Sequence, residues 1–134
     1  MERHFDLELD DLKKTLLAMG GMVEETINKA VSSLKNLSPK EAREVITADR
    51  RIDEIEIEID NKTFELIMRH QPLAGDLRLI MMAGKIGTEL ERIADLAVDV
   101  AERTLELSGQ LLIKPLIDIP KLSALAQQMV RESL

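Results

Sequence analysis

Hydrophobic residues recur at alternating steps of three and four along most of this chain. That spacing places them on one face of an α-helix. Three long runs of the pattern predict helices over residues 6–36, 39–69 and 73–107, and a fourth run begins at Pro120. No stretch of the sequence shows the period of two that is typical of a β-strand. The pattern therefore predicts an all-α fold, an antiparallel three-helix bundle of long helices with the beginning of a fourth helix.

The first two helices each carry one apolar face that should be buried. In the first helix this face consists of Phe5, Leu9, Leu12, Leu16, Met19, Val23, Ile27, Ala30 and Leu34. In the second helix it consists of Val45, Ala48, Ile52, Ile55, Ile59 and Leu66. A Gly20-Gly21 pair interrupts the first helix and costs about 2 kcal/mol of helix propensity relative to alanine. We expect close backbone packing at this pair, and a hinge is the alternative.

Short signals separate the helices. Ser38, Pro39 and Glu41 form a capping box, in which the serine and glutamate side chains would each bond the other's backbone N–H. The link at residues 70–72 is short, so the second and third helices should be antiparallel neighbours. Ser108-Gly109 ends the third helix. The chain thus divides into a bundle over residues 1–109 and a segment over residues 110–134, which holds a linker with a loop at residues 111–119 and the fourth helix.

The third helix carries two apolar faces, so it should contact two neighbouring helices. One face consists of Leu77, Ile80, Gly84, Gly87, Ala94, Val98, Ala101 and Leu105. The other consists of Leu79, Ala83, Ile86, Leu90, Ile93, Ala97 and Val100. Gly84 and Gly87 are expected to allow tight helix packing. Glu91 stands within the first face, and Asp95 and Asp99 follow at steps of four, so a row of carboxylates borders one contact.

The second helix carries a similar row beside its apolar face, made of Asp49, Asp53, Glu56 and Asp60. Neighbouring carboxylates repel unless they are protonated or bridged by cations. If the two rows face each other, their oxygens converge, which suits hard cations such as magnesium, calcium, manganese or iron. Burial of Glu91 favours this interpretation, because a buried charge needs a partner. The alternative is that both rows are solvated faces neutralised by Arg50, Arg51, Arg92 and Arg103.

Composition narrows the classes of function. The 134 residues suit one domain or part of a larger one, and 45% hydrophobic with 1% aromatic residues is typical of long helices packed on aliphatic faces. The absence of cysteine excludes disulfides and thiolate metal sites. A net charge of −7 argues against a nucleic-acid binder and favours cations or basic protein surfaces as partners. No apolar run reaches the ~18 residues of a membrane span, so no membrane insertion is expected.

An enzyme is a weaker interpretation of this sequence. A ferritin-like di-iron oxidase would need Glu-x-x-His motifs on two helices, and neither His4 nor His70 stands three residues after a glutamate. Both histidines are expected at the surface near helix ends. No Ser/His/Asp set can be assembled, and the glycines do not form a phosphate loop. We therefore predict that the protein is not an enzyme.

Three segments carry a resemblance to a known family. They are RIDEIEIEID at residues 51–60, RHQPLAGDLRLI at residues 69–80 and GTELERIADLAVDVAE at residues 87–102. In order and spacing, over about residues 5–107, the chain resembles the PhoU family of phosphate-transport regulators. The resemblance implies three-helix bundles, two per full-length chain, so that the fourth helix would start the second repeat. It also implies that the family's acidic metal motifs are matched by Asp49, Asp53, Glu91 and Asp95.

This chain departs from the family pattern at two positions near those motifs. Family members often carry His where this chain has Leu96, and often carry Asn where it has Asp99. Asp99 is therefore added to the candidate metal ligands as a further oxygen. The expected cofactors are divalent or trivalent metal ions held by oxygen ligands, with iron, manganese, magnesium and zinc as the candidates.

The resemblance further implies a cytoplasmic negative regulator that acts by contact. Members of the family link the phosphate-specific ABC transporter to a sensor histidine kinase and so repress the phosphate-starvation response. A generic helical adaptor, which binds a basic protein partner without metal, is the alternative. We also expect a homodimer that exchanges the fourth helix, because an apolar stripe there would otherwise lack a bundle of its own. That stripe consists of Leu122, Leu125, Met129 and Val130.

Overall fold

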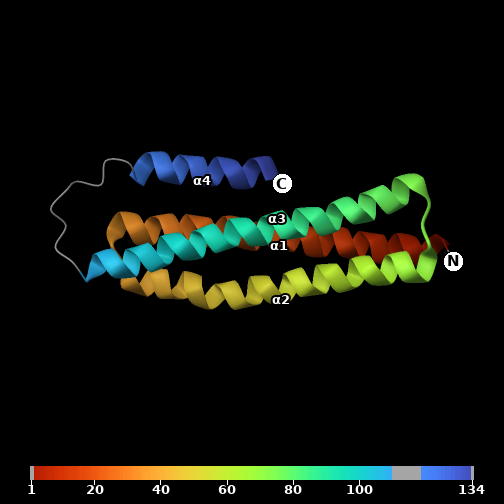
Figure 1. Cartoon of the computed structure of the whole chain (residues 1–134), viewed down its shortest axis with the longest axis horizontal. Helices are drawn as coiled ribbons and strands as arrows, with labels where there is room; N and C mark the ends of the chain where they lie inside the picture. The colour runs from red at the N-terminus through yellow and green to blue at the C-terminus, as the bar shows by residue number, and fades with distance from the viewer. Residues whose placement is uncertain (1, 110–118, 134) are drawn as a thin grey trace.

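The protein is described here by a computed structural model covering residues 2–109 and 119–133. Its elements are α1 (Glu2–Asn36), α2 (Pro39–His70), α3 (Ala74–Ser108) and α4 (Ile119–Ser133). The first three helices run antiparallel in succession and form an elongated bundle, and α4 lies along the part of it where α3 ends (Figure 1). No strand occurs in the described ranges. The predicted all-α bundle with a fourth helix is confirmed.

The boundaries of α2 and α3 lie within one residue of the prediction, whereas α1 begins four residues earlier than residue 6. The early start has a visible cause, since the first turns of α1 are held by the end of α2. The Phe5 ring meets the His70 ring edge-on, with 5.1 Å between ring centroids. His70 Nε2 also lies 3.0 Å from Glu8 Oε2, and the His70 side chain is only 13% exposed. The predicted surface position is therefore wrong for His70 and correct for His4.

The capping box before α2 is only half formed. The Ser38 Oγ accepts a hydrogen bond from the Glu41 N–H at 3.2 Å, as predicted. The reciprocal bond is absent because the Ser38 N–H donates to the Ser33 carbonyl oxygen at 2.8 Å. The chain enters α2 directly from α1, and this backbone bond holds the tight corner between them.

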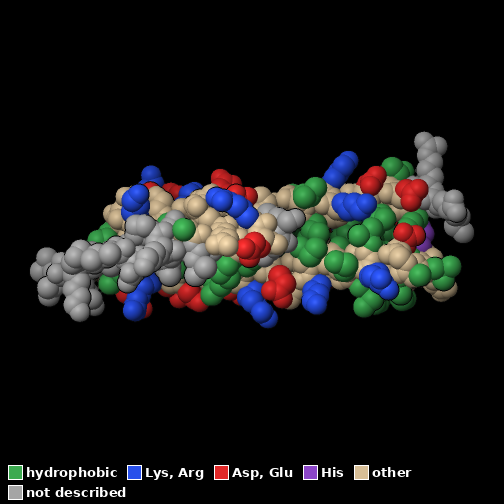
Figure 2. All heavy atoms as spheres, turned by 90° about the horizontal axis from the view of Figure 1, so that it is seen from above, with side chains coloured by type: hydrophobic (Ala, Val, Ile, Leu, Met, Phe, Trp, Pro, Cys, Tyr) green, Lys and Arg blue, Asp and Glu red, His purple; other side chains and the backbone are tan. Residues whose placement is uncertain are grey.

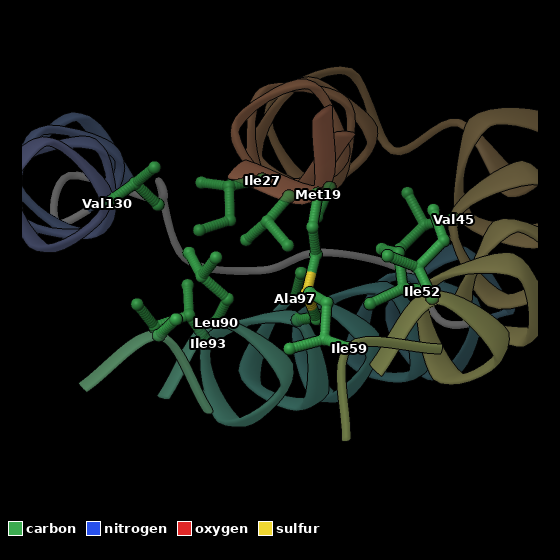
Figure 3. Close-up of a cluster of buried hydrophobic side chains, with 14 of the residues drawn as sticks. Met19, Ile27, Val45, Ile52, Ile59, Leu90, Ile93, Ala97 and Val130 are labelled. Carbon is green, nitrogen blue, oxygen red and sulfur yellow. The ribbon is translucent and has the colours of Figure 1, made fainter. Parts of the chain in front are cut away.

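A continuous apolar core fills the space between α1, α2 and α3 (Figure 3). The predicted faces of α1 and α2 are buried, with Phe5, Leu16 and Ala48 only partly so. Both predicted faces of α3 are also used, which confirms that this helix contacts two neighbours. The exception is Leu79, which is 41% exposed. The fully buried core side chains are each worth about 1.5–3 kcal/mol and include Leu12, Met19, Ile52, Ile59, Leu66, Ile80 and Leu90.

Glycine has different consequences in the two long helices that carry it. A Cβ at Gly87 would lie 3.3 Å from Ile59 Cγ2, and one at Gly84 would lie 3.7 Å from Thr63 Cγ2, so α2 and α3 approach each other closely there. At Gly21 an added Cβ would meet no atom within 4 Å. The prediction of tight packing is thus confirmed for α3 and wrong for Gly21, and α1 continues as one helix through the glycine pair.

Two polar contacts fix how α1 lies against α3 and α4. The fully buried hydroxyls of Ser33 and Thr104 lie 3.1 Å apart across the α1–α3 contact. On the outer side, Gln127 Nε2 of α4 donates to Asn28 Oδ1 of α1 at 2.8 Å. Both contacts lie in the C-terminal half of α1. The described part of the chain contains no helix long and apolar enough to cross a membrane.

The fourth helix packs in the groove between α1 and α3 of its own chain. Val130 is fully buried there, while Met129 is 39% exposed. The helix begins at Ile119, one residue before the predicted start. The side chains of Leu122 and Leu125, and residues 110–118 of the predicted loop, lie outside the described residues. The division of the chain at residue 109 remains a prediction.

Candidate metal-binding site

Carboxylates of α2 and α3 face each other across the contact between these helices. Asp49 on α2 feels the negative charges of Asp53, on its own helix, and of Asp95, on α3. Glu91 on α3 feels in turn the charges of Asp53 and of Glu56 on α2. Because such interactions weaken with distance and with intervening water, the two rows lie close together. The sequence-predicted residues Asp49, Asp53, Glu91 and Asp95 are thus brought to one region.

Burial and mutual repulsion both disfavour the charged forms of the two half-buried carboxyls of α2. Burial is the larger cause of the raised pKa of Asp49, and the charges of Asp53 and Asp95 add to it. Burial also raises the pKa of Glu56, followed by the charges of Asp60, Asp53 and Asp95. These groups therefore hold protons more tightly than free carboxylates do.

Glu91 shows the largest effect in the cluster. Burial, a hydrogen bond with Asp95, and the charges of Asp95, Glu56 and Asp53 together raise its pKa to about 7. Asp95 lies one helical turn after Glu91, so the two carboxyls can share a proton along the same face of α3. Near neutral pH this pair is poised between sharing a proton and losing it, which is the state in which a cation competes well for the oxygens.

Two oxygens of the cluster are buried without a hydrogen-bond partner in the described residues, namely Asp49 Oδ1 and Glu56 Oε2. A buried polar atom that lacks a partner is rare and destabilising, and it calls for an explanation. The neighbouring arginines do not supply one. Arg51 pairs with Glu54 at 3.4 Å and Arg92 pairs with Glu89 at 3.8 Å, both on the exposed side of their helices.

The donor set fits a hard cation, because it contains carboxylate oxygens alone. A bound cation would also satisfy the orphaned oxygens of Asp49 and Glu56. Within residues 2–109 and 119–133, however, no three acidic or histidine side chains stand close enough together to hold one ion. The number of ligands per ion therefore stays a prediction.

Two residues differ from the sequence-based expectation. Asp99 is exposed, and it is not among the charges that act on Asp49, Glu56 or Glu91. Glu56 belongs to the cluster although it was not among the predicted ligands. Its position three residues after Asp53, on the same side of α2, was the available signal. The orphaned oxygen that distinguishes it depends on the packing of α3 and could not be read from spacing.

Fold and cluster together define a class: elongated helical bundles with acidic rows on two facing helices. The profile of the PhoU domain matches residues 16–104, about two thirds of the chain. The chain therefore belongs to the PhoU family, and the resemblance inferred from its motifs is confirmed.

Individual relatives support the same conclusion. The chain is 37% identical over 127 residues to the phosphate-specific transport system accessory protein PhoU homolog of Aquifex aeolicus, covering 95% of this chain and 58% of that protein. It is 33% identical over 130 residues to the accessory protein PhoU of Escherichia coli K12, covering 97% and 54%. This chain thus spans little more than half the length of these relatives.

Solved structures of relatives have the same fold. The crystal structure of PhoU from Pseudomonas aeruginosa superposes with a TM-score of 0.90 at 36% identity, covering 96% of this chain and 62% of that one. The phosphate transport system regulatory protein PhoU from Streptococcus pneumoniae superposes with a TM-score of 0.82 at 27% identity, covering 95% and 59%. The agreement extends over nearly all of the chain and therefore includes most of α4.

Proposed function

We propose that this protein is a non-enzymatic negative regulator of phosphate uptake and of the phosphate-starvation response. Membership of the PhoU family carries the proposal, since its relatives are named as accessory proteins of phosphate-specific transport systems. The protein acts in the cytoplasm by contact with the phosphate ABC transporter and a phosphate sensor histidine kinase.

Gene deletion tests the regulatory role. A strain that lacks the gene should express phosphate-scavenging genes constitutively in high phosphate, and the intact gene supplied in trans should restore repression. Expression of a phosphate-regulated promoter is the readout, and growth in limiting phosphate is the control for induction. Normal repression in the deletion strain would contradict the assignment.

The facing carboxylates supply the second part of the proposal, which is metal binding. Divalent or trivalent cations would be held by Asp49, Asp53, Glu91 and Asp95, with Glu56 joining them and Asp99 as an outer ligand. Support comes from the buried, unbonded oxygens of Asp49 and Glu56 and from the raised pKa of Glu91. Iron, manganese, magnesium and zinc are the candidate ions. When bound, such an ion supplies positive charge that relieves repulsion between the helices.

Elemental analysis of the purified protein and calorimetric titration with manganese, iron, magnesium and zinc test this part. The double variant Asp53→Asn/Asp95→Asn should lose binding. The matched control is Glu54→Gln/Glu106→Gln, which removes two exposed carboxylates that pair with arginines on the outer surface. If both double variants bind equally well, the ions are held elsewhere.

A helical adaptor without metal is the second candidate, and the net charge of −7 favours a basic partner for it. Failure of every cation titration, together with capture of a basic partner, would support this alternative. We also propose a homodimer that exchanges α4 between copies. Sedimentation of the intact chain and of a form that ends at Gly109 tests this, because only the intact chain should dimerise.

A further inference from the structure

The groove between α1 and α3 is only partly filled by α4. Figure 1 shows that α4 covers the part nearer the C-terminal ends of α1 and α3 and leaves the part nearer their N-terminal ends open. Figure 2 shows hydrophobic side chains gathered on that open part of the same face. We call this region the open groove and define it by residues 12–23 of α1 and residues 77–88 of α3.

The open groove continues the surface on which α4 already lies. On α3, Leu79 and Met82 are 41% and 53% exposed, and steps of three and four lead from them to Ile93 and Leu96 beside α4. On α1, Leu17 is 70% exposed, and the same steps lead from it to Asn28, which bonds to α4. The floor of the open groove is therefore apolar and lies in line with a bound helix.

The charge of the open groove is opposite to that of the molecule. The chain contains 25 acidic residues, yet residues 12–23 and 77–88 contain none. They contain instead Lys13, Lys14, Arg78 and Lys85, all of which are exposed. None of these four side chains makes an ion pair within the described residues, whereas Arg51, Arg69, Arg92 and Arg103 each pair with a glutamate.

We propose that the open groove binds an amphipathic helix of a partner protein, with an apolar stripe flanked by acidic residues. The apolar floor would receive the stripe, as the other half of the groove receives Val130 of α4. The unpaired cations would meet the acidic flanks, which gives the contact its specificity. This inference rests on the proposed function in one respect, because a regulator that acts by contact needs a surface for its partner.

A second copy of the chain is a poorer occupant of this surface. Two copies that met through the same surface would bring Lys13, Lys14, Arg78 and Lys85 of one copy towards those of the other. Juxtaposed like charges oppose association. The proposed exchange of α4 uses the other half of the groove, so it does not compete with a partner helix.

Designed peptides test the proposal with the whole chain. One peptide forms a helix with a leucine stripe flanked by glutamates, and the other has the same stripe flanked by lysines. In fluorescence anisotropy the acidic peptide should bind and the basic one should not. Arg78→Glu/Lys85→Glu should weaken binding of the acidic peptide about tenfold or more. The matched control Lys35→Glu/Arg43→Glu makes the same charge change at exposed, unpaired cations elsewhere and should leave binding unchanged.

Location and specificity decide the outcome. Amide chemical shifts should move in residues 12–23 and 77–88 when the acidic peptide binds, and Met82→Gln should weaken binding without a change of charge. Equal binding of both peptides, equal loss in both double variants, or shifts confined to other helices would overturn the proposal. Concentration-dependent dimers that Leu17→Glu dissociates would assign the groove to a second copy instead. Repression measured in the deletion strain is independent of these results, so the two proposals can fail separately.

Discussion

Charged residues enter the helix contacts of this bundle at two places, and the two are organised differently. Between α1 and α2, Lys62 Nζ lies 2.7 Å from Asp11 Oδ2 and 3.1 Å from Glu58 Oε1, and it donates to Thr15 Oγ1 at 2.8 Å. Burial works against the charged form of Lys62, but its bonds to Asp11 and Glu58 raise its pKa above the usual value. Every charge in this group has an opposite partner.

Between α2 and α3 the charges all have one sign. The cluster of Asp49, Asp53, Glu56, Glu91 and Asp95 contains no cation, and two of its buried oxygens have no hydrogen-bond partner in the described residues. Both groups share α2, so the difference does not come from a general tolerance of this helix for buried charge. A fold that pairs its charges at Lys62 and leaves them unpaired at Glu91 points to a role for the unpaired set outside stability.

Saturation with metal should have the largest effect on this contrast. A cation that binds only the folded protein, at a concentration of 100 to 1,000 times its dissociation constant, stabilises it by about 3–4 kcal/mol. The melting temperature should therefore rise on addition of cation and fall again with chelator. The variant Asp53→Asn/Asp95→Asn should show no response, and a wild-type melting temperature indifferent to both reagents would argue for solvated faces.

The pH dependence should be the next largest effect. The folded-state pKa of Glu91, about 7, exceeds its ordinary value of 4.5, so the folded state holds more protons between these values. Stability of the metal-free protein should therefore fall as pH rises from 5 to 8, by about 1–2 kcal/mol given that the site is partly open to water. Thermal melts of wild type and Glu91→Gln measure this, and the variant should lose most of the decline. Parallel curves would contradict the raised pKa.

Single substitutions at the two groups should act with opposite signs. Lys62→Met leaves Asp11 and Glu58 without their cation and should destabilise the protein by about 1–2 kcal/mol. Glu56→Gln removes one repelling charge and gives the site a donor, so it should stabilise the metal-free protein by about 1 kcal/mol. Urea denaturation in chelator measures both, and loss of stability in Glu56→Gln would show that its carboxylate is not strained.

The smallest effect is expected at a carboxylate outside both groups. Glu54 lies on the exposed side of α2 and pairs with Arg51 at 3.4 Å, with both side chains more than half exposed. Exposed pairs of this kind contribute little, so Glu54→Gln should change stability by less than about 0.5 kcal/mol. The same denaturation experiment gives the value, and a larger change would mean that total charge, rather than position in the cluster, governs the other results.

The helices themselves could be predicted from sequence because their information is local. Steps of three and four fixed the faces of α1 and α2, and Ser38-Pro39 fixed the start of α2 to the residue. The facing carboxylate rows also followed, since an antiparallel hairpin of α2 and α3 leaves few ways to place Asp53 and Asp95. These features need no knowledge of which atoms fill the space between helices.

The features that sequence did not predict depend on that space. The contact of His70 with Glu8 requires the end of α2 to meet the start of α1, residues that lie 62 positions apart. The orphaned oxygen of Glu56 follows from how closely α3 approaches, which the side chain of Ile59 against Gly87 determines. The exposure of Leu79 follows from the place where α4 lies. In each case the pattern indicated a face, and the tertiary contact decided what occupied it.

The arrangement of the carboxylates also bears on the order in which the protein folds. The whole cluster belongs to a single helical hairpin, α2 and α3, whereas the buried Ser33–Thr104 pair joins parallel helices across 71 residues of chain. Hairpin contacts close shorter loops and so form at lower entropic cost, before the contacts of α1 with α3. The mutual repulsion of the carboxylates therefore acts on the earliest part of the fold to assemble. A cation that bridges the hairpin would raise the rate of folding, and a chelator would slow folding more than it accelerates unfolding.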